Sequence, residues 1–249
     1  MFCIKKTVSI ILPTKNESET LEQILLSILF EFSNSNYTPQ IIIADDNSTD
    51  GTKEIMEKFA TRYPNKIIPL HRSPPYGFGL SVAEAINKAS GFATIIMMAD
   101  FSDRPSDAIK MAEKIEEGFD IVFSTRFSKG GKAHKYPLLK YLANRSFNNV
   151  LRILFLIPYS DTSNAFKAYK TELIKSLTPT SKGFEITIEL PLLAIMNGAK
   201  ACEIPVFWSN RDRGVPKWNI LNAFIRYSTK LTELFFLRFV SSKTKISRS

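Results

Sequence analysis

Residues that define disulfide-rich, fibrous or membrane-spanning proteins are scarce in this sequence. Cys3 and Cys202 are the only cysteines among 249 residues, which is too few for a disulfide scaffold, and their spacing suggests no metal site. No apolar run approaches the roughly 18 residues that cross a bilayer, and the N-terminus is not typical of a signal peptide. With 44% hydrophobic and 23% charged residues, the composition predicts a globular protein in a reducing, cytoplasmic setting.

Acidic residues are absent from 121–160, where the chain carries seven lysines and arginines. The stretch 217–249 holds seven more basic residues and a single acid, Glu233, within a chain of net charge +9. This distribution predicts an anionic partner for the second half: a nucleic acid, a membrane surface or a phosphorylated substrate. A solvated basic surface is the alternative. Because no nucleic-acid motif is visible, we expect no nucleic-acid partner.

The first 125 residues alternate between short apolar runs and segments with helical spacing. The runs predict strands at 8–12, 41–44, 67–70, 94–99 and 120–124. This alternation predicts an α/β fold with a mostly parallel, twisted sheet and helices on both faces. Ligands of such folds bind where the strands end at their carboxyl termini.

The pattern changes after residue 125. We expect a loop at 126–136, helices at 137–156, 171–177 and 185–197, and strands at 164–169 and 201–208. From 218 onward the sequence predicts a basic amphipathic helix. We therefore expect one domain over 1–218, followed by this helix and a tail over 219–249.

Carboxylates follow two of the predicted strands. Asp45 and Asp46 come after the second strand, and Asp100 and Asp103 come after the fourth. A buried carboxylate is costly without a partner, so these groups suit hydrogen bonds to a nucleobase or ribose, or Mg²⁺ or Mn²⁺ on a diphosphate. Helix capping is the alternative, and it explains Asp103 better than Asp100.

Nine motifs in a fixed order carry a family resemblance. They are SIILPTKNE (9–17), ADDNSTDGT (44–52), GFGLSVAEAI (77–86), MADFSDRP (98–105), FSTRFSKGG (123–131), DTSNAFKAY (161–169), GFEITIE (183–189), EIPVFWSNR (203–211) and RGVPKW (213–218). In these motifs the chain resembles glycosyltransferase family 2, which has the GT-A nucleotide-sugar fold. Within that family it is most similar to the polyprenyl-phosphate sugar synthases.

The resemblance implies roles for individual residues. The base and ribose of a UDP- or GDP-sugar would be held by Pro13, Lys15, Glu17, Ala44 and Asp46. The catalytic residues would be Asp100, Arg126 and Arg211, of which the two arginines would contact phosphates or the sugar. Lys217 would lie on the donor diphosphate.

The same resemblance implies a metal site and an acceptor site. Mg²⁺ or Mn²⁺ would be bound by Asp100, Ser102 and Asp103, and the acceptor phosphate by Lys132 and Lys140. The sequence departs from the family at the usual D-x-D metal motif, whose first position is Met98. It also has Pro216 before the late lysine, where a serine is usual.

The acceptor is predicted from what the catalytic region lacks. A hydroxyl acceptor needs a general base, and relatives that glycosylate hydroxyls tend to carry a Glu-Asp pair that this chain does not have. A phosphate monoester is already anionic at pH 7 and needs no base. We therefore expect inverting transfer to a dolichyl or undecaprenyl phosphate at the inner face of a membrane.

Alternatives remain open at this point. They are a family 2 enzyme with a saccharide or other hydroxyl acceptor in cell-envelope glycan synthesis, and a nucleotide-sugar-binding protein without activity. A nucleotidyltransferase is disfavoured because PTKNE (13–17) is not a glycine-rich phosphate loop. Residues 220–240 either lie on the membrane as a peripheral contact or pack on the catalytic domain or on a second subunit of a homodimer.

Overall fold

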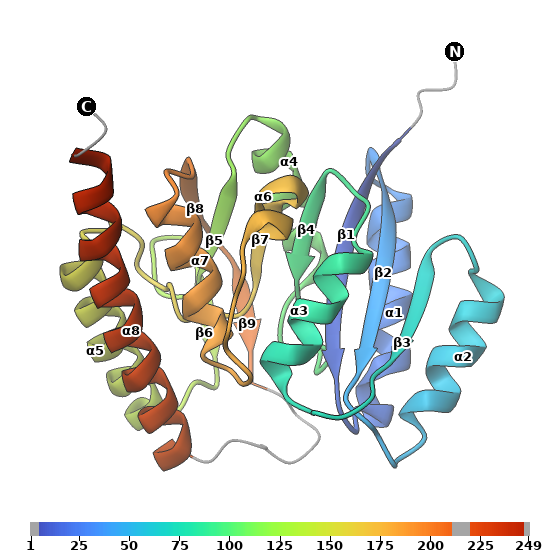
Figure 1. Ribbon diagram of the computed structural model, residues 1–249. Helices are drawn as coiled ribbons and strands as arrows, with labels where there is room; N and C mark the ends of the chain where they lie inside the picture. Colours follow the sequence, from blue (N-terminus) through green and yellow to red (C-terminus); the bar gives the residue numbers. More distant parts are fainter. Residues whose placement is uncertain (1–4, 211–219, 247–249) are drawn as a thin grey trace.

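A seven-stranded mixed sheet forms the centre of the protein (Figure 1). The computed structural model describes residues 5–210 and 220–246 and, in the last helix, the side chains of 225–238. The strand order is β3-β2-β1-β4-β7-β5-β8. The strands are β1 (Lys6–Thr14), β2 (Tyr37–Asp45), β3 (Ile67–His71), β4 (Ala93–Ile96), β5 (Ile121–Thr125), β7 (Lys167–Lys170) and β8 (Ala201–Pro205). All neighbouring pairs are parallel except those that β7 makes with β4 and β5.

Helices cover both faces of the sheet, as the alternation of apolar runs predicts. One face packs against α1 (Ser18–Ser33), α2 (Thr52–Arg62) and α4 (Pro105–Glu116). The other packs against α3 (Phe78–Lys88), α6 (Thr171–Ser176) and α7 (Ile186–Met196). Because helices cover both of its faces, the sheet is built from nearly unbroken apolar strands such as IIIA in β2. The predicted α/β class is confirmed.

A further layer lies outside α7. It consists of α5 (Leu138–Phe155) and α8 (Ile220–Ile246), which run side by side in the same direction. The rings of Phe147 and Tyr227 are 5.5 Å apart, and Arg238 donates to the carbonyl of Leu154. Because α7 packs against the sheet on one side and against these helices on the other, its sequence is apolar all round. Among the helices that the structure describes, none combines the length and apolar character needed to cross a bilayer.

The predicted strand at 201–208 is interrupted. It divides into β8 and β9 (Phe207–Ser209), and β9 leaves the main sheet to pair with β6 (Lys132–His134). Pro205 has no N–H to donate, so the pairing of β8 with β5 ends there. Strand β6 lies inside the predicted loop 126–136, and the strand predicted from residue 164 begins at Lys167.

Candidate active site

The carboxyl ends of the parallel strands gather the candidate residues at one edge of the sheet. Lys15 and Glu17 follow β1, Asp46 follows β2, Asp100 follows β4 and Arg126 follows β5. Strand β7 runs in the opposite direction, so the segment before it, which begins at Asp161, reaches the same edge. This edge is where open α/β sheets bind ligands.

The candidate donor residues lie on neighbouring loops. Pro13 and Ala44 pair across β1 and β2, and the Asp46 N–H donates to the Thr14 carbonyl at 2.8 Å. The Glu17 N–H donates to the Thr52 hydroxyl at 3.0 Å, which ties the two loops together. The five residues that the resemblance assigns to the base and ribose thus come from adjacent turns, and their role in donor binding stays a prediction.

Asp46 is buried and held by three donors. Its Oδ1 accepts from Arg72 Nη1, from the Ser81 hydroxyl at 3.3 Å and from the Gly77 N–H at 3.2 Å. Arg72 in turn donates from Nε to Glu84 at 3.0 Å. Because all three bonds fall on Oδ1, the carboxylate is fixed in one orientation at the edge of the site.

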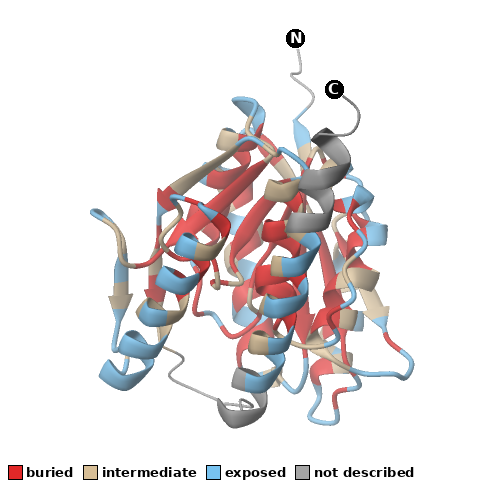
Figure 2. Cartoon of the chain, turned by 60° about the vertical axis from the view of Figure 1, so that its left-hand side comes forward, coloured by how far each residue is buried: buried red, intermediate tan, exposed pale blue. Residues whose placement is uncertain are grey.

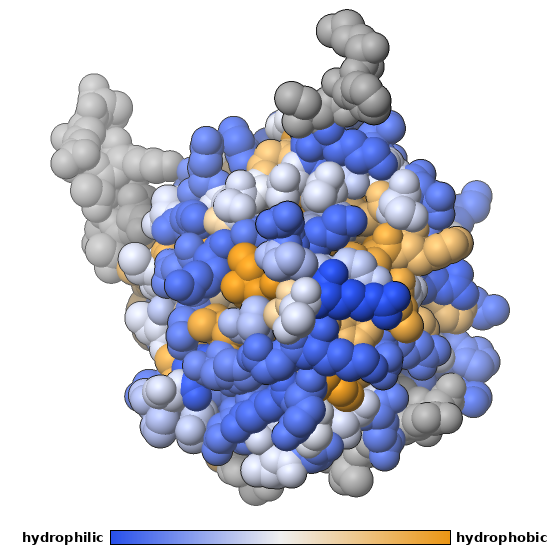
Figure 3. Space-filling view, turned by 90° about the vertical axis from the view of Figure 1, so that its right-hand side faces the viewer, coloured by the Kyte–Doolittle hydropathy of each residue, from blue (hydrophilic) through white to orange (hydrophobic). Residues whose placement is uncertain are grey.

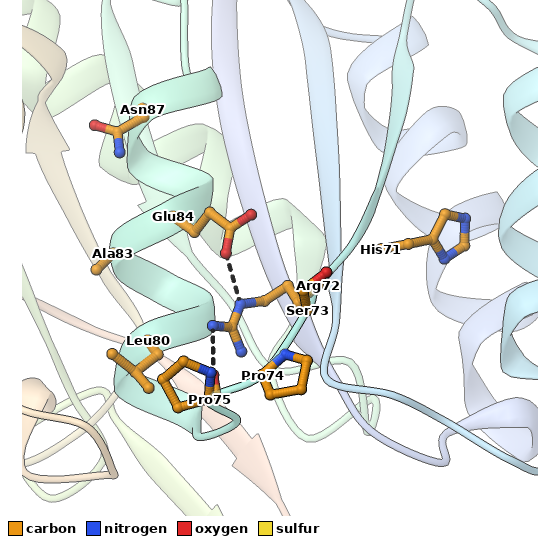
Figure 4. Close-up of a pocket in the computed structure, with 9 residues that line it drawn as sticks. All are labelled: His71, Arg72, Ser73, Pro74, Pro75, Leu80, Ala83, Glu84 and Asn87. Carbon is orange, nitrogen blue, oxygen red and sulfur yellow. Dashed lines mark hydrogen bonds and ion pairs between the residues drawn. The ribbon is translucent and has the colours of Figure 1, made fainter.

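A pocket lies beside Arg72, between β3 and the start of α3 (Figure 4). The Arg72 guanidinium points toward Glu84 and donates to the carbonyl of Pro75 at 3.1 Å. His71 points away from this group, and its ring lies 2.5 Å from Glu57 on α2. The His71 side chain therefore contacts α2, while the residue itself lies at the border of the pocket.

Glycines allow the loop at 180–183 to lie directly on the start of α3. The Gly79 N–H donates to the Lys182 carbonyl at 3.0 Å. A Cβ on Gly79 would lie 2.4 Å from the Ser181 carbonyl oxygen, which is closer than real side chains approach. The same loop is held from behind by α8, where Lys230 donates to the Thr180 hydroxyl at 2.7 Å.

Two buried carboxylates lie on the turn that follows β4. Asp100 accepts from the Ser102 N–H at 3.1 Å, and Asp103 accepts from the Met98 N–H at 3.3 Å. Burial and the charge of Asp100 raise the pKa of Asp103 to about 7. Phe101 between them has φ 61°, a left-handed conformation that is strained for a bulky residue and is typical of functional turns.

These residues fit a divalent cation. Asp103 Oδ1 is buried and has no hydrogen-bond partner among the described residues, and Asp100 lies close enough to repel it. A cation between the two carboxylates would give Asp103 Oδ1 a partner and would reduce the repulsion between Asp100 and Asp103. Mg²⁺ is commonly held by one or two carboxylates together with substrate phosphates. Within the described ranges, no cluster of three acidic, histidine or cysteine side chains forms a metal site. Ser102, also predicted as a ligand, is buried beside them.

Arg126 is held in a buried ion pair. Its Nε and Nη2 donate to the two carboxylate oxygens of Asp161 at 2.7 and 2.8 Å. Burial acts to lower the pKa of Arg126, but the charge and hydrogen bonds of Asp161 outweigh it and raise that pKa. The pair fixes the guanidinium at the end of β5, close to Asp103, whose charge also acts on it.

An aromatic cluster joins Arg126 to the predicted acceptor residues. The Arg126 guanidinium lies 5.4 Å from the Tyr136 ring and 5.8 Å from the Trp208 ring. Lys140 Nζ lies 5.2 and 5.6 Å from the same two rings. Trp208 forms a β-bridge with Asp103, so the basic residues and the carboxylates belong to one continuous site.

The remaining predicted residues are placed as follows. Lys132 is exposed at the start of β6, where its N–H donates to the Val206 carbonyl at 3.0 Å. Arg211 and Lys217 lie outside the described residues. The assignments of all three stay predictions.

Sequence reasoning missed three contributors to this edge. Arg72 directly follows β3, so the rule that ligand residues follow strands could have found it. Asp161 opens a family motif, but its pairing with Arg126 depends on the reversed direction of β7. Tyr136 shows no signal in the sequence, because only the fold brings it to Trp208, where the ring centroids are 5.0 Å apart.

An α/β fold with buried carboxylates at the carboxyl edge of its sheet is what the comparisons with known proteins have to explain, and they give the family. The model of the glycosyl transferase family 2 matches residues 9–178. This chain belongs to that family.

Two curated relatives carry names that refer to polyprenyl lipids. A dolichol-phosphate mannosyltransferase from Pyrococcus furiosus is 31% identical over 214 residues, covering 84% of this chain and 58% of the relative. A polyprenol monophosphomannose synthase from Mycolicibacterium smegmatis is 26% identical over 216 residues, covering 84% and 79%. The match thus spans less than two thirds of the first relative.

Solved structures confirm the GT-A-like fold. Glucosyl-3-phosphoglycerate synthase from Mycobacterium tuberculosis, in complex with Mn²⁺, UDP-glucose and phosphoglyceric acid, superposes with a TM-score of 0.68. It is 18% identical, and the superposition covers 92% of this chain and 80% of that one.

Proposed function

We propose that the chain transfers a sugar from a UDP- or GDP-linked donor to a polyprenyl phosphate, such as dolichyl or undecaprenyl phosphate, with inversion at the anomeric carbon. An oxygen of the acceptor phosphate attacks that carbon, the bond to the donor diphosphate breaks, and the nucleoside diphosphate leaves with the electron pair. The acceptor oxygen carries no proton that must be removed at pH 7.

One observation carries the acceptor assignment. Lys140 and Arg126 lie on the same two rings, Tyr136 and Trp208, and Trp208 bridges to Asp103. The exposed cation of Lys140 therefore borders the site of the carboxylates, and the surrounding stretch 121–160 contains no acid to repel an anionic acceptor. The names of the two curated relatives support the same acceptor class.

Two acidic side chains of the second half, Asp161 and Glu189, have structural partners. Asp161 is paired with Arg126, and Glu189 lies 3.1 Å from Lys230 and accepts from the Ser181 N–H at 2.8 Å. Their partners support the view that neither acts as a base for a hydroxyl acceptor. A phosphate acceptor makes no such demand.

Asp100, Asp103 and Ser102 would hold Mg²⁺ or Mn²⁺ in this proposal. The cation would supply charge neutralisation on the departing diphosphate. The Mn²⁺ and UDP-glucose in the glucosyl-3-phosphoglycerate synthase complex support this assignment. Lys15, Glu17 and Asp46 would orient the nucleoside from the opposite side of the edge.

The test is a donor-by-acceptor assay. Purified protein with Mg²⁺ or Mn²⁺ is mixed with labelled UDP- and GDP-sugars and with dolichyl or undecaprenyl phosphate in detergent. Label passing into the organic phase with one donor is the expected result. Label that appears only on saccharide acceptors would overturn the proposal.

The Asp100→Asn variant should lose at least about a hundredfold in turnover, because the neutral amide cannot balance charge at the diphosphate. Its fold should persist, since the amide oxygen can still accept from the Ser102 N–H. The matched control is Glu22→Gln, an exposed change on α1 that should keep full rate. Full activity of Asp100→Asn at saturating cation would show that the metal assignment is wrong.

A hydroxyl acceptor is the second candidate, and one observation favours it. Within the part of the chain that the structure describes, Glu185 Oε2 is buried without a hydrogen-bond partner, although Oε1 accepts from the Gly183 N–H at 2.9 Å and lies 4.0 Å from Arg226. A buried carboxylate oxygen of this kind suits a general base. Transfer to a saccharide that the Glu185→Gln variant abolishes would favour this candidate over the lipid phosphate.

A further inference from the structure

The largest group of exposed apolar side chains lies on α5. Within the described residues, fourteen large hydrophobic residues are exposed, and half of them belong to α5 or to the residue that ends it. Six of these seven share one side of the helix: Leu138 (73% exposed), Leu139 (79%), Leu142 (53%), Val150 (43%), Ile153 (73%) and Leu156 (77%). We call this set the α5 apolar face.

The α5 apolar face is distinct from the side of the helix that packs on the protein. Asn148, Leu151 and Phe155 are buried on the opposite side, toward α7 and α8. The helix is therefore apolar on both sides, with one side unpartnered (Figure 2). The end of the molecule formed by α2 and β3 contrasts with it, since hydrophobic residues appear there in small, separate areas of a mostly hydrophilic surface (Figure 3).

The sequence left open whether the C-terminal helix lies on a membrane or packs on the catalytic domain. The residues expected to face a membrane from the C-terminal helix include Leu231, Leu234 and Phe235. In the structure these side chains pack in the cluster shared by α5, α7 and α8, and Leu234 is 1% exposed. These α8 residues thus pack on the protein, although Ile225, Phe236 and Leu237 of the same helix are exposed, and among the described residues α5 carries the larger set of exposed apolar side chains.

We infer that α5 docks on the surface of an anionic lipid membrane. Helix α5 carries three basic residues and no acid, with Arg145 and Arg152 along one flank of the apolar face and Lys140 near the N-terminal end, and Lys129, Lys132 and Lys135 lie in the preceding segment. An apolar face flanked by cations is the arrangement with which amphipathic helices lie in the headgroup plane. At 18 residues, α5 offers about 27 Å of length for such contact.

Charge favours a membrane over a second copy of the chain. A two-fold interface through α5 would bring each basic flank against the same flank of the other copy. No acid between 121 and 160 could compensate that repulsion. An anionic lipid surface neutralises the same residues.

The link between α5 docking and the acceptor site rests on the proposed function. Lys140 lies near the N-terminal end of α5 and contacts the aromatic cluster of the candidate site. Docking through α5 would therefore hold the predicted acceptor lysines at the headgroup level, where the phosphate of a membrane-embedded polyprenyl phosphate lies.

The test is flotation with vesicles of phosphatidylcholine and phosphatidylglycerol, without donor, acceptor or cation. The chain should float with these vesicles, and high salt or pure phosphatidylcholine should weaken binding. The triple variant Leu139→Ser, Leu142→Ser, Ile153→Ser should bind at least about tenfold more weakly. Because the three side chains are exposed, its thermal unfolding should match the wild type.

The matched control removes exposed apolar side chains elsewhere. Leu26→Ser with Phe30→Ser, on α1, should leave vesicle binding unchanged. Equal binding by the triple variant and the wild type would overturn the inference. A wild-type protein that does not bind vesicles would also overturn it. If that protein sediments as a dimer and the triple variant as a monomer, the α5 apolar face belongs to an interface with a second copy.

Failure of the inference and failure of the proposed function give different results. Transfer to a short, water-soluble polyprenyl phosphate without vesicle binding would contradict only the membrane inference. Vesicle binding through α5 with transfer only to saccharides would contradict only the proposed acceptor. If both hold, the triple variant keeps its rate on the short acceptor and loses it on vesicle-embedded acceptor.

Discussion

Buried charges at the sheet edge are each held by named partners. Lys167, at the start of β7, is 1% exposed, and its ammonium donates to the carbonyls of Asn164 and, at 3.1 Å, Thr187. Asp161 and Arg126 lie nearby and act on it electrostatically. An unpaired buried charge would be far more costly, so this residue connects the segment before β7 to α7 through backbone acceptors.

Lys167 should give the protein a specific pH dependence. Burial lowers its pKa to about 7, so between pH 7 and about 10 the unfolded chain binds the proton that the folded chain lacks. The free energy of unfolding of the wild type, relative to Lys167→Met, should therefore rise with pH across that window, by up to about 1.4 kcal/mol per pH unit. Urea unfolding of both proteins at several pH values measures this difference, and a constant difference would contradict it.

At the scale of elements, side chains of α8 hold the segment 180–183 in place by hydrogen bonds. Lys230 is buried and donates to Glu189 at 3.1 Å, to Glu233 at 2.7 Å and to Thr180 at 2.7 Å. The Tyr227 hydroxyl adds a bond to the Phe184 carbonyl at 2.9 Å. The C-terminal helix is therefore fastened to the catalytic fold by polar contacts as well as by its apolar side.

Removing the charged side chain of Lys230 should weaken the contact of α8 with segment 180–183. Lys230→Met leaves the buried Glu189 carboxylate without its cationic partner, with only the hydrogen bonds from Thr180 and Ser181, and we expect a loss of about 2–4 kcal/mol in the free energy of unfolding. Lys58→Met is the matched control, because its pair with Glu22 is exposed and should contribute less than about 1 kcal/mol. Equal losses in denaturant unfolding would show that this contact adds nothing.

Elements with strong local patterns could be predicted from the sequence, and those that depend on distant partners could not. Apolar runs located β1 to β5, and helical spacing located α5 within a residue at each end. Strand β6 was missed because KAH has no strand pattern and exists only through pairing with β9. The uncovered face of α5 was missed for a related reason: α5 is apolar on both sides, and only packing decides which side is covered.

At the scale of the whole molecule, the candidate site draws on both halves of the chain. Asp46 and Asp100 come from the first half, and Arg126, Tyr136 and Trp208 come from the second. The order of family motifs was enough to predict which residues follow the strands. It could not predict the ion pair of Arg126 with Asp161, because that contact depends on the antiparallel insertion of β7.

Ligand binding should therefore stabilise the entire fold. Mn²⁺ together with UDP or GDP should raise Tm by about 5 °C at saturation, since a ligand that binds only the native state adds its binding energy to stability. Nucleotide without cation should raise Tm less, because the diphosphate then faces Asp100 and Asp103 uncompensated. Thermal unfolding measures both shifts, and an equal shift with and without cation would contradict a shared metal site.

The contact of segment 180–183 with the start of α3 has a thermodynamic consequence. The Gly77 N–H donates to Asp46 while the neighbouring Gly79 rests on the Lys182 carbonyl, which α8 supports from behind. If segment 180–183 links nucleoside binding at Asp46 to the packing of α8, the coupling between these two equilibria is reciprocal. We therefore expect a nucleoside that binds at Asp46 to favour the packed position of α8, and whatever holds α8 in place should improve nucleoside affinity by the same factor.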